Sequence, residues 1–270
     1  MSWVGGKKAL REEVVKRFPL FYERYVEVFG GGGWVLFHKA PGNDFEVYND
    51  YNGLLANLYR CVRDKPDLLI NALKYVLNSR EDFDRARLAL RRKRTTDIQR
   101  AAWFYQVIRQ SYAAALTSFA SQPHDMWSNF PLIEQAHRRL ADVVVENQDF
   151  QTLIRHYDRP VTFFYCDPPY LISNGSYNDG RRGFKDWTPL EDRQLLSLLD
   201  ELDRAKILFA LSNVFVHKGM TNEELIRWSQ RYHVLHLEQN YANCSYHAKD
   251  RSGNTQEVLI TNYLPPLSGE

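Results

Sequence analysis

Cysteine is scarce in this sequence. Cys61, Cys166 and Cys244 are the only three among 270 residues, and they lie far apart with no C-x-x-C pair. Isolated thiols predict neither a disulfide framework nor a zinc site, and they are typical of a reducing compartment. The eight histidines are scattered and show no metal-ligand spacing, so we expect no bound metal.

Long apolar runs are also missing. No stretch is apolar over the roughly 20 residues that a membrane-spanning helix needs. The first residues, MSWVGGKKALREE, have no apolar core after their charges, so we do not expect a signal peptide. The sequence therefore predicts a cytoplasmic protein of a bacterium, an archaeon or a phage. Its net charge of +2 is small, so a nucleic-acid partner would need locally concentrated positive charge.

Short apolar segments rich in β-branched and aromatic residues predict seven strands. They cover residues 25–29, 45–50, 143–146, 161–166, 206–213, 232–238 and 257–263. Helical patterns lie between most of them, which favours a mostly parallel sheet between layers of helices. The last two segments are joined by a loop without a helix, so we expect them to pair antiparallel. Residues 64–140 show several helices and no strand, which indicates a helical insertion.

The sharpest signal is Asp167-Pro168-Pro169-Tyr170, directly after the apolar segment 161–166. Ligands bind beyond the carboxyl ends of strands in an open α/β sheet, so a site is expected there. The Asp167 carboxylate and the Pro168 carbonyl can both accept N–H bonds from an exocyclic amine, which frees the nitrogen lone pair for attack. Tyr170 offers a ring on which a flat base can stack. The alternative is an ordinary acidic proline turn.

Four glycines, Gly30 to Gly33, follow the strand segment 25–29 and precede a helical pattern. A strand, a glycine turn and a helix open a Rossmann-like unit, and Glu27 beside the turn can bind an ammonium group. Asp50 ends the next strand about twenty residues later, where an acid accepts bonds from ribose hydroxyls. A plain tight turn and a helix N-cap at Asp50 are the alternatives.

Two other segments give weaker signals. Residues 3–7, WVGGK, place two glycines and a lysine before a helical pattern, where they can approach an anionic carboxylate. The loop from Leu171 to Trp187 follows DPPY and contains Arg181 and Arg182, so it can close on a nucleic-acid substrate. A solvated lysine and an ordinary surface loop are the alternatives.

Positive charge is concentrated in the helical insertion. Residues 80–109 contain nine Lys or Arg and four Asp or Glu, and the densest run is Arg91 to Arg94. Such a run can neutralise DNA phosphates. The alternative is a solvated helix face on which Glu81, Asp82 and Asp84 pair with nearby arginines.

These segments together resemble the Dam-like family of DNA adenine-N6 methyltransferases, the D12 class. WVGGK resembles the family's first motif, EVFGGGG its glycine motif, YND its ribose acid and CDPPY its catalytic motif, while NQDF, LSN and EVLITNY are similar to later segments. Their order, with the insertion between the glycine motif and DPPY, is that of the α group. The FGGGG motif has a glycine where other members of the family often carry another residue. The insertion does not align, so the family's common GATC target is not transferred.

The resemblance implies an α/β fold, a Rossmann-like, seven-stranded, S-adenosylmethionine-dependent methyltransferase sheet that is mostly parallel with one antiparallel strand. Residues 1–63 and 141–270 would form this catalytic domain, and residues 64–140 the helical target recognition insertion. The implied reaction moves a methyl group from S-adenosylmethionine to the N6 amine of a flipped-out adenine in double-stranded DNA, and leaves S-adenosylhomocysteine. A restriction endonuclease is a further partner to expect, and a monomer is expected, with a dimer as the alternative.

The implied site residues form three groups. The catalytic group is Asp167, Pro168, Pro169 and Tyr170. The cofactor-binding group is Trp3, Gly6, Lys7, Glu27, Phe29, Gly30, Gly31, Asp50, Tyr51, Asp149, Phe150 and Asp167. The DNA-binding group is Arg91, Arg92, Lys93, Arg94, Arg109, Tyr112, Arg181 and Arg182.

Other functions fit parts of this pattern. Methyltransferases for RNA adenine, cytosine N4 or protein glutamine share the fold, but the last two often have Asn or Ser at the position of Asp167. RNA is less clearly excluded. A catalytically silent DNA-binding subunit need not keep DPPY, the glycine turn and Asp50 together. A nicotinamide-dependent oxidoreductase would explain the glycines and Asp50 but not DPPY.

The basic run gives a first prediction. Neutralising Arg91, Arg92, Lys93 and Arg94 should flatten the dependence of DNA affinity on salt, because each lost phosphate contact lowers the slope of log K against log salt by about 0.9. Fluorescence anisotropy of a labelled duplex across a salt series measures that slope. An unchanged slope would remove the run from the DNA interface.

Overall fold

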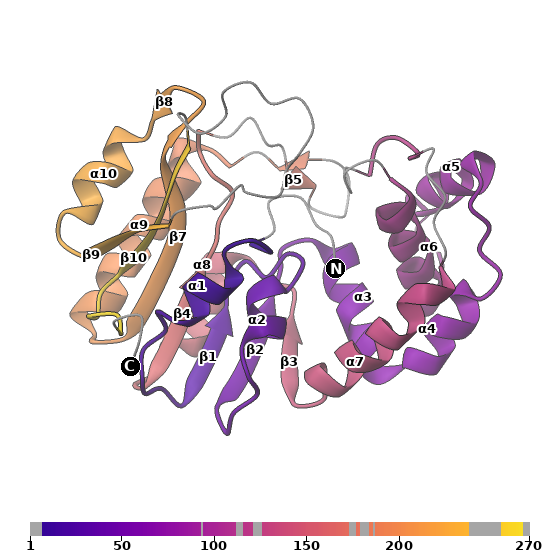
Figure 1. Cartoon of the computed structure of the whole chain (residues 1–270), viewed down its shortest axis with the longest axis horizontal. Helices are drawn as coiled ribbons and strands as arrows, with labels where there is room; N and C mark the ends of the chain where they lie inside the picture. The colour runs from indigo at the N-terminus through magenta and orange to yellow at the C-terminus, as the bar shows by residue number, and fades with distance from the viewer. Residues whose placement is uncertain are drawn as a thin grey trace.

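The computed structural model describes residues 7–92, 94–111, 116–120, 126–172, 177–178, 184–185, 187–237 and 255–266. Its central sheet follows the order β3-β2-β1-β4-β7-β10-β9 (Figure 1). These strands are β1 (Arg24–Glu27), β2 (Phe45–Asn49), β3 (Val143–Glu146), β4 (Thr162–Cys166), β7 (Leu208–His217), β9 (His233–Leu237) and β10 (Thr255–Thr261). All seven predicted strands are therefore confirmed.

The sheet has one strand more than predicted. β8 (Met220–Thr221) pairs with the end of β7 as an eighth strand, and β5 (Tyr177–Asn178) and β6 (Phe184–Lys185) form a separate two-stranded ribbon. Segments of two residues cannot show the alternation that identifies a strand in a sequence. Within the main path, β10 runs antiparallel to both β7 and β9, as expected from the loop before it.

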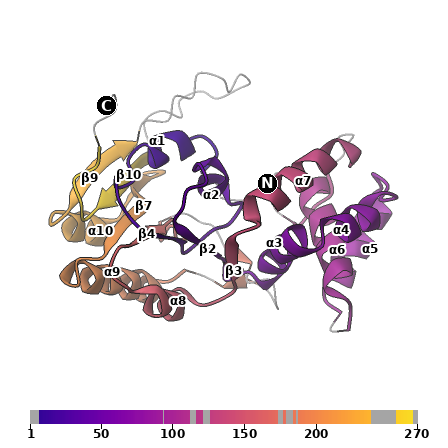
Figure 2. The same cartoon turned by 90° about the horizontal axis from the view of Figure 1, so that it is seen from below.

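Helices cover both faces of the sheet. They are α1 (Arg11–Val15), α2 (Trp34–His38), α3 (Gly53–Asp64), α4 (Pro66–Leu73), α5 (Arg80–Ala89), α6 (Asp97–Gln110), η2 (Trp127–Asn129), α7 (Phe130–Leu140), α8 (Phe150–Tyr157), α9 (Pro189–Arg204) and α10 (Glu223–Ser229). Viewed from below, α1 and α2 lie on one side of the sheet, and α8, α9 and α10 on the other (Figure 2). No helix among the described residues is long and apolar enough to cross a membrane.

Alternation along the strands divides the core into two parts. On β1, Tyr25 packs into the core under α1 and α2, whereas Val26, and Val28 just after the strand, pack into the core under α8 and α9. The helices α3 to α7 pack against one another beside the β3 edge of the sheet, with α3 in contact with α4, α6 and α7 (Figures 1 and 2). This helical group therefore extends one side of the molecule without covering the centre of the sheet.

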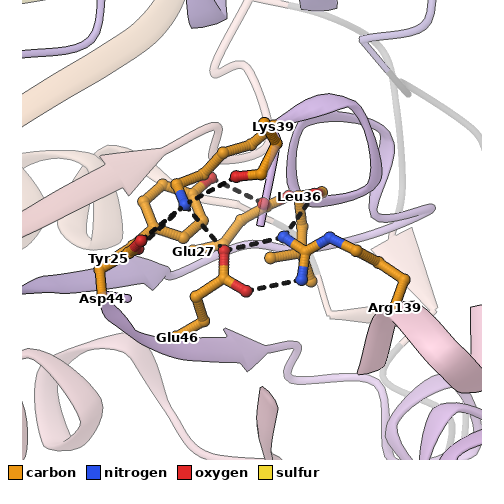
Figure 3. Close-up of polar contacts among 8 residues, drawn as sticks. Tyr25, Glu27, Leu36, Lys39, Asp44, Glu46 and Arg139 are labelled. Carbon is orange, nitrogen blue, oxygen red and sulfur yellow. Dashed lines mark hydrogen bonds and ion pairs between the residues drawn. The ribbon is translucent and has the colours of Figure 1, made fainter. Parts of the chain in front are cut away.

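A buried ion-pair network fastens α7 to the sheet (Figure 3). Arg139 of α7 donates from Nη1 and Nη2 to the two carboxylate oxygens of Glu46 on β2, at 2.6 and 2.8 Å, and from Nη2 to the Leu36 carbonyl of α2 at 3.0 Å. The Lys39 Nζ lies 2.9 Å from Glu46 Oε1 and 2.9 Å from Asp44 Oδ2. A single arginine thus joins the helical group to β2 and to the helix after the glycine turn.

Replacing Arg139 with Met should lower the free energy of unfolding by about 3 kcal/mol, because a buried carboxylate loses its bidentate partner and keeps only Lys39. Urea unfolding followed by circular dichroism measures the change. The exposed neighbour Arg138 gives the matched control, since Arg138→Met should change stability by no more than about 0.5 kcal/mol. Equal stabilities of the two variants would contradict this assignment.

Candidate active site at the carboxyl edge of the sheet

The glycine turn after β1 is held from several sides. The Gly30 N–H donates to the Asn49 carbonyl at 2.7 Å, and the Tyr48 hydroxyl donates to the Gly31 carbonyl at 2.7 Å. A Cβ on Gly30 would lie 2.1 Å from the Tyr48 ring, and Gly33 has a positive φ of 67°. Glycine is therefore required at both positions, by contact at Gly30 and by backbone conformation at Gly33.

Asp50 connects this turn to the end of β2. Its Oδ2 accepts the Gly31 N–H at 2.8 Å and its Oδ1 accepts the Asn52 N–H at 2.7 Å. Burial raises the pKa of Asp50 to about 6, although these two backbone bonds lower it. The alternative of Asp50 as the N-cap of α3 is wrong, because the side chain of Asn52 caps that helix. Asp50 thus faces the glycine turn.

The loop after β3 joins the same edge. Asn147 donates from Nδ2 to the Asp50 carbonyl at 2.8 Å, and Asp149 caps α8 by accepting the Gln151 N–H at 3.0 Å. Beside this loop, the rings of Phe29 and Phe150 lie 5.7 Å apart between their centroids. These contacts bring three segments that are distant in the sequence to one end of the sheet.

A third ring completes an aromatic cluster. Trp187 lies 5.6 Å from Phe29 and 5.5 Å from Phe150, measured between ring centroids. Its indole N–H donates to the buried Asp192 of α9 at 3.0 Å, which fixes the ring orientation. The cluster presents aromatic surface next to the glycine turn, as a site for a flat ring requires.

Glu27 lies at the end of β1 and is only 2% exposed. It accepts a hydrogen bond from the Tyr25 hydroxyl at 2.8 Å. Burial raises the pKa of Glu27 to about 8; the Tyr25 hydrogen bond lowers it, and the nearby charge of Asp167 raises it by a smaller amount. A cationic ligand close to this carboxyl would favour its ionised form.

Asp167 follows the last residue of β4 directly, as the sequence predicts. Its Oδ1 lies 3.2 Å from the Lys7 ammonium and accepts the Tyr170 hydroxyl at 3.1 Å. Lys7 also donates to the Tyr170 hydroxyl and lies 3.2 Å from Glu257 Oε2. Lys7, the catalytic motif and the start of β10 therefore meet in one charged cluster.

The cluster changes the acidity of its members. Burial raises the pKa of Asp167 to about 6, against the lowering effect of Lys7 and with a smaller contribution from the charge of Glu257. Burial by itself lowers the pKa of Lys7, but the attraction of Asp167 and Glu257 outweighs it, so the lysine pKa is raised. Lys7 is therefore a fixed positive charge, whereas Asp167 ionises close to neutral pH.

This geometry coincides with a sequence match. Residues 3–243 match the profile of the D12 class N6 adenine-specific DNA methyltransferases. The chain belongs to this family. That membership confirms the resemblance drawn from the DPPY, glycine and ribose-acid motifs.

Individual methyltransferases show the same relation. The chain is 56% identical over 99 residues to Type II methyltransferase M.FokI of Planomicrobium okeanokoites, and this match covers 37% of this chain and 15% of that protein. It is 30% identical over 286 residues to Modification methylase StsI of Streptococcus sanguinis, covering 97% of this chain and 42% of the relative. It is 25% identical over 287 residues to Type II methyltransferase M1.LlaDCHI of Lactococcus lactis subsp. cremoris, covering 97% and 94%. The chain thus spans less than half the length of M.FokI and StsI.

Most cofactor residues implied by the family lie at this carboxyl edge. Gly30, Gly31, Asp50 and the 39%-exposed Tyr51 surround the turn. Trp3, Gly6, Lys93, Tyr112, Arg181 and Arg182 lie outside the described residues. Among the described residues, no group of His, Cys, Asp or Glu has the arrangement of a metal site.

The predicted DNA-binding arginines that the structure describes lie in the helical group. In α5, Arg85 pairs with Glu81 and Asp82, and Arg87 pairs with Asp84, so these acids are neutralised within the helix. Arg91, Arg92 and Arg94 follow the helix, are exposed and make no ion pair within the described ranges, whereas Arg109 is half-buried in α6. The α5 pairs match the solvated-helix alternative, but Arg91, Arg92 and Arg94 do not.

Sequence reasoning missed two members of the site. Glu257 lies ninety residues after Asp167 in the sequence, and only the register of β10 brings it to Lys7. In the sequence Trp187 marks only the end of the loop after DPPY, and no local pattern pairs it with Phe29. The one available signal for Glu257 was the expected antiparallel direction of its strand.

Replacing Gly30 with Ala should weaken binding of S-adenosylmethionine and lower stability by about 1–3 kcal/mol, because the new methyl group must displace the Tyr48 ring. Titration calorimetry and urea unfolding measure the two effects. Gly219→Ala is the control, since its Cβ meets nothing within 4 Å and reports only the cost of a left-handed backbone. A Gly30 variant that binds as tightly as the control would refute the role of the turn.

Proposed function

We propose that the chain is a site-specific DNA methyltransferase, which transfers a methyl group to the N6 amine of a flipped-out adenine in double-stranded DNA. The observation that carries this proposal is Asp167, a carboxylate beyond the end of β4, followed by Pro168 and Pro169 and bonded to Lys7 and Tyr170. Membership of the adenine-specific family supports the choice of base.

The residues at the carboxyl edge fit S-adenosylmethionine. This cofactor has an ammonium group, a ribose with two hydroxyls, an adenine ring and a cationic sulfonium that supplies the methyl group when bound. Glu27, Asp50 and Asp167 end three adjacent strands and match the cationic and hydroxyl groups. Phe29 and Phe150, with Trp187, offer aromatic surface for the ring.

The catalytic residues would act on the adenine amine. Asp167 Oδ1 and the Pro168 carbonyl accept its two N–H bonds, so the nitrogen becomes tetrahedral and its lone pair points away from the ring. Tyr170 stacks on the base and holds its plane. Bound S-adenosylmethionine would supply the methyl group, its carbon–sulfur bond breaking as the nitrogen–carbon bond forms, and the Asp167 carboxylate would accept the surplus N–H proton. Positioning of this kind contributes several kcal/mol, about 7–11 at most.

The protonation state of Asp167 sets the pH range of this step. Because burial raises the pKa of its carboxyl to about 6, the group is ionised and able to accept the amine only above that pH. The rate should therefore fall as the pH decreases through about 6. The high pKa also makes Asp167 a better proton acceptor than an exposed aspartate.

The helical residues 64–140 would bind the target DNA, and the two flanking segments would form the catalytic domain. The exposed arginines 91, 92 and 94 are free to contact phosphates, which supports this division. Names such as modification methylase and type II methyltransferase among the relatives support a role beside a restriction endonuclease. Catalysis by a monomer remains our expectation, with a dimer as the alternative.

Purified protein incubated with S-adenosylmethionine and unmethylated genomic DNA should place N6-methyladenine in one short sequence motif, detectable by single-molecule sequencing. Asp167→Asn should reduce transfer about a thousandfold or more, since an amide presents one acceptor and no charge to the amine. Calorimetry should show that the variant still binds the cofactor.

The exposed Asp142 provides the matched control, and Asp142→Asn should methylate at the normal rate. Modified cytosine in place of adenine would disprove the assigned base. Full activity of Asp167→Asn would disprove the mechanism.

A further inference from the structure

The Lys7 ammonium is shared between two carboxylates. It lies 3.2 Å from Asp167 Oδ1 and 3.2 Å from Glu257 Oε2, and it also donates to the Tyr170 hydroxyl. The ammonium is 4.7 Å from the centroid of the Tyr170 ring. Lys7 is buried, so this arrangement is shielded from solvent and its charges interact strongly.

The direction of β10 explains how Glu257 reaches the site. In parallel strands only the carboxyl end lies at the active-site edge, but β10 runs antiparallel and brings its amino-terminal half there. Glu257 pairs with Val214 of β7, whereas Gln256 pairs with Val216, so the register shifts between these two residues. Such a bulge re-aims a side chain and often lies beside an active site.

We propose that Glu257 is a positioning residue that shares the Lys7 ammonium with Asp167, so that Asp167 is oriented by Lys7 without being fully neutralised by it. This inference rests on the proposed function, in which Asp167 must accept the adenine amine. With a single carboxylate partner, Lys7 would form a closed ion pair on Asp167 Oδ1. The amine would then have to compete with that pair for the same oxygen.

The net charge of the cluster supports the sharing of Lys7 between the two carboxylates. Lys7, Asp167 and Glu257 together carry one positive and two negative charges when the acids are ionised, which leaves one negative charge. A site with this net charge favours a cationic sulfonium, and the product thioether, which has no such charge, loses that attraction. When the adenine amine binds Asp167 Oδ1, Glu257 is already in contact with Lys7 and holds the ammonium.

Other ionisable groups also interact with Asp167, among them the neighbouring Cys166 thiol, whose pKa the Asp167 charge raises. Glu27 from β1 and Tyr165 from β4 interact electrostatically with Asp167, and Tyr170 donates to it. Lys7 is the cation that lowers the pKa of Asp167, and Glu257 is the anion that raises it after burial. Removing Glu257 should therefore lower the Asp167 pKa, and strengthen its pair with Lys7.

Carbon-13 NMR of the whole chain with labelled aspartate carboxyls can follow Asp167 directly, with Asp167→Asn identifying its signal. In Glu257→Gln, which keeps the side-chain size, the Asp167 titration midpoint should move to lower pH. Glu257→Asp keeps the charge, so its midpoint should stay near that of the native protein. The exposed Glu134 gives the control, and Glu134→Gln should leave the midpoint unchanged. A midpoint that stays or rises in Glu257→Gln would overturn the proposal.

A double-mutant cycle separates sharing from simple repulsion between the two acids. In a Lys7→Met background, Glu257→Gln should shift the Asp167 midpoint less than it does when Lys7 is present. Equal shifts in the two backgrounds would mean that Glu257 does not act through Lys7, and would reject the sharing.

Kinetics test the consequence for transfer. Glu257→Gln should lower kcat about tenfold to a hundredfold at neutral pH, as expected for a misplaced catalytic group. The acid limb of the pH–rate profile should move to lower pH. A normal kcat would overturn the proposed benefit of sharing. If the native protein methylates no adenine, the proposed function fails, whereas the NMR titrations still decide whether Glu257 shares Lys7.

Discussion

The site depends on the in-register pairing of adjacent parallel strands, which places their carboxyl ends side by side at one edge of the sheet. Glu27 at the end of β1 pairs in register with Tyr48 of β2 and Tyr165 of β4, so the residues that follow each strand emerge at one edge. This register brings the glycine turn, Asp50 and Asp167 together from three distant segments. None of them could meet in a structure with antiparallel neighbours, whose corresponding ends point in opposite directions.

The same arrangement creates an electrostatic problem. Three carboxyl groups are buried at this edge, and burial raises the pKa of each, to about 8 for Glu27 and about 6 for Asp50 and Asp167. Backbone N–H groups stabilise Asp50, and Lys7 stabilises Asp167, whereas Glu27 has the Tyr25 hydroxyl. A cationic group beside Glu27 and Asp167 would favour the ionised form of both carboxyls.

The site and the helical group share one strand. β2 carries Glu46 near its start and leads to Asp50 at its end, and Arg139 of α7 binds Glu46 and the Leu36 carbonyl of α2. The helical group, in which the exposed arginines follow α5, is therefore joined through α7 to β2 and α2, the elements beside the glycine turn.

The sequence by itself determined the strand count of the main path, the antiparallel end of the sheet, the glycine turn and the DPPY edge, because local periodicity and short motifs encode these features. It failed to show β8, whose two residues have no periodicity, and the cap at Asn52, which stands beside an equally good candidate in Asp50. Only the tertiary structure decided that Glu257 meets Lys7, that Trp187 joins Phe29 and Phe150, and that Arg139 reaches Glu46. These contacts join residues far apart in the chain, and their pairing depends on strand register and helix packing, which no local pattern records.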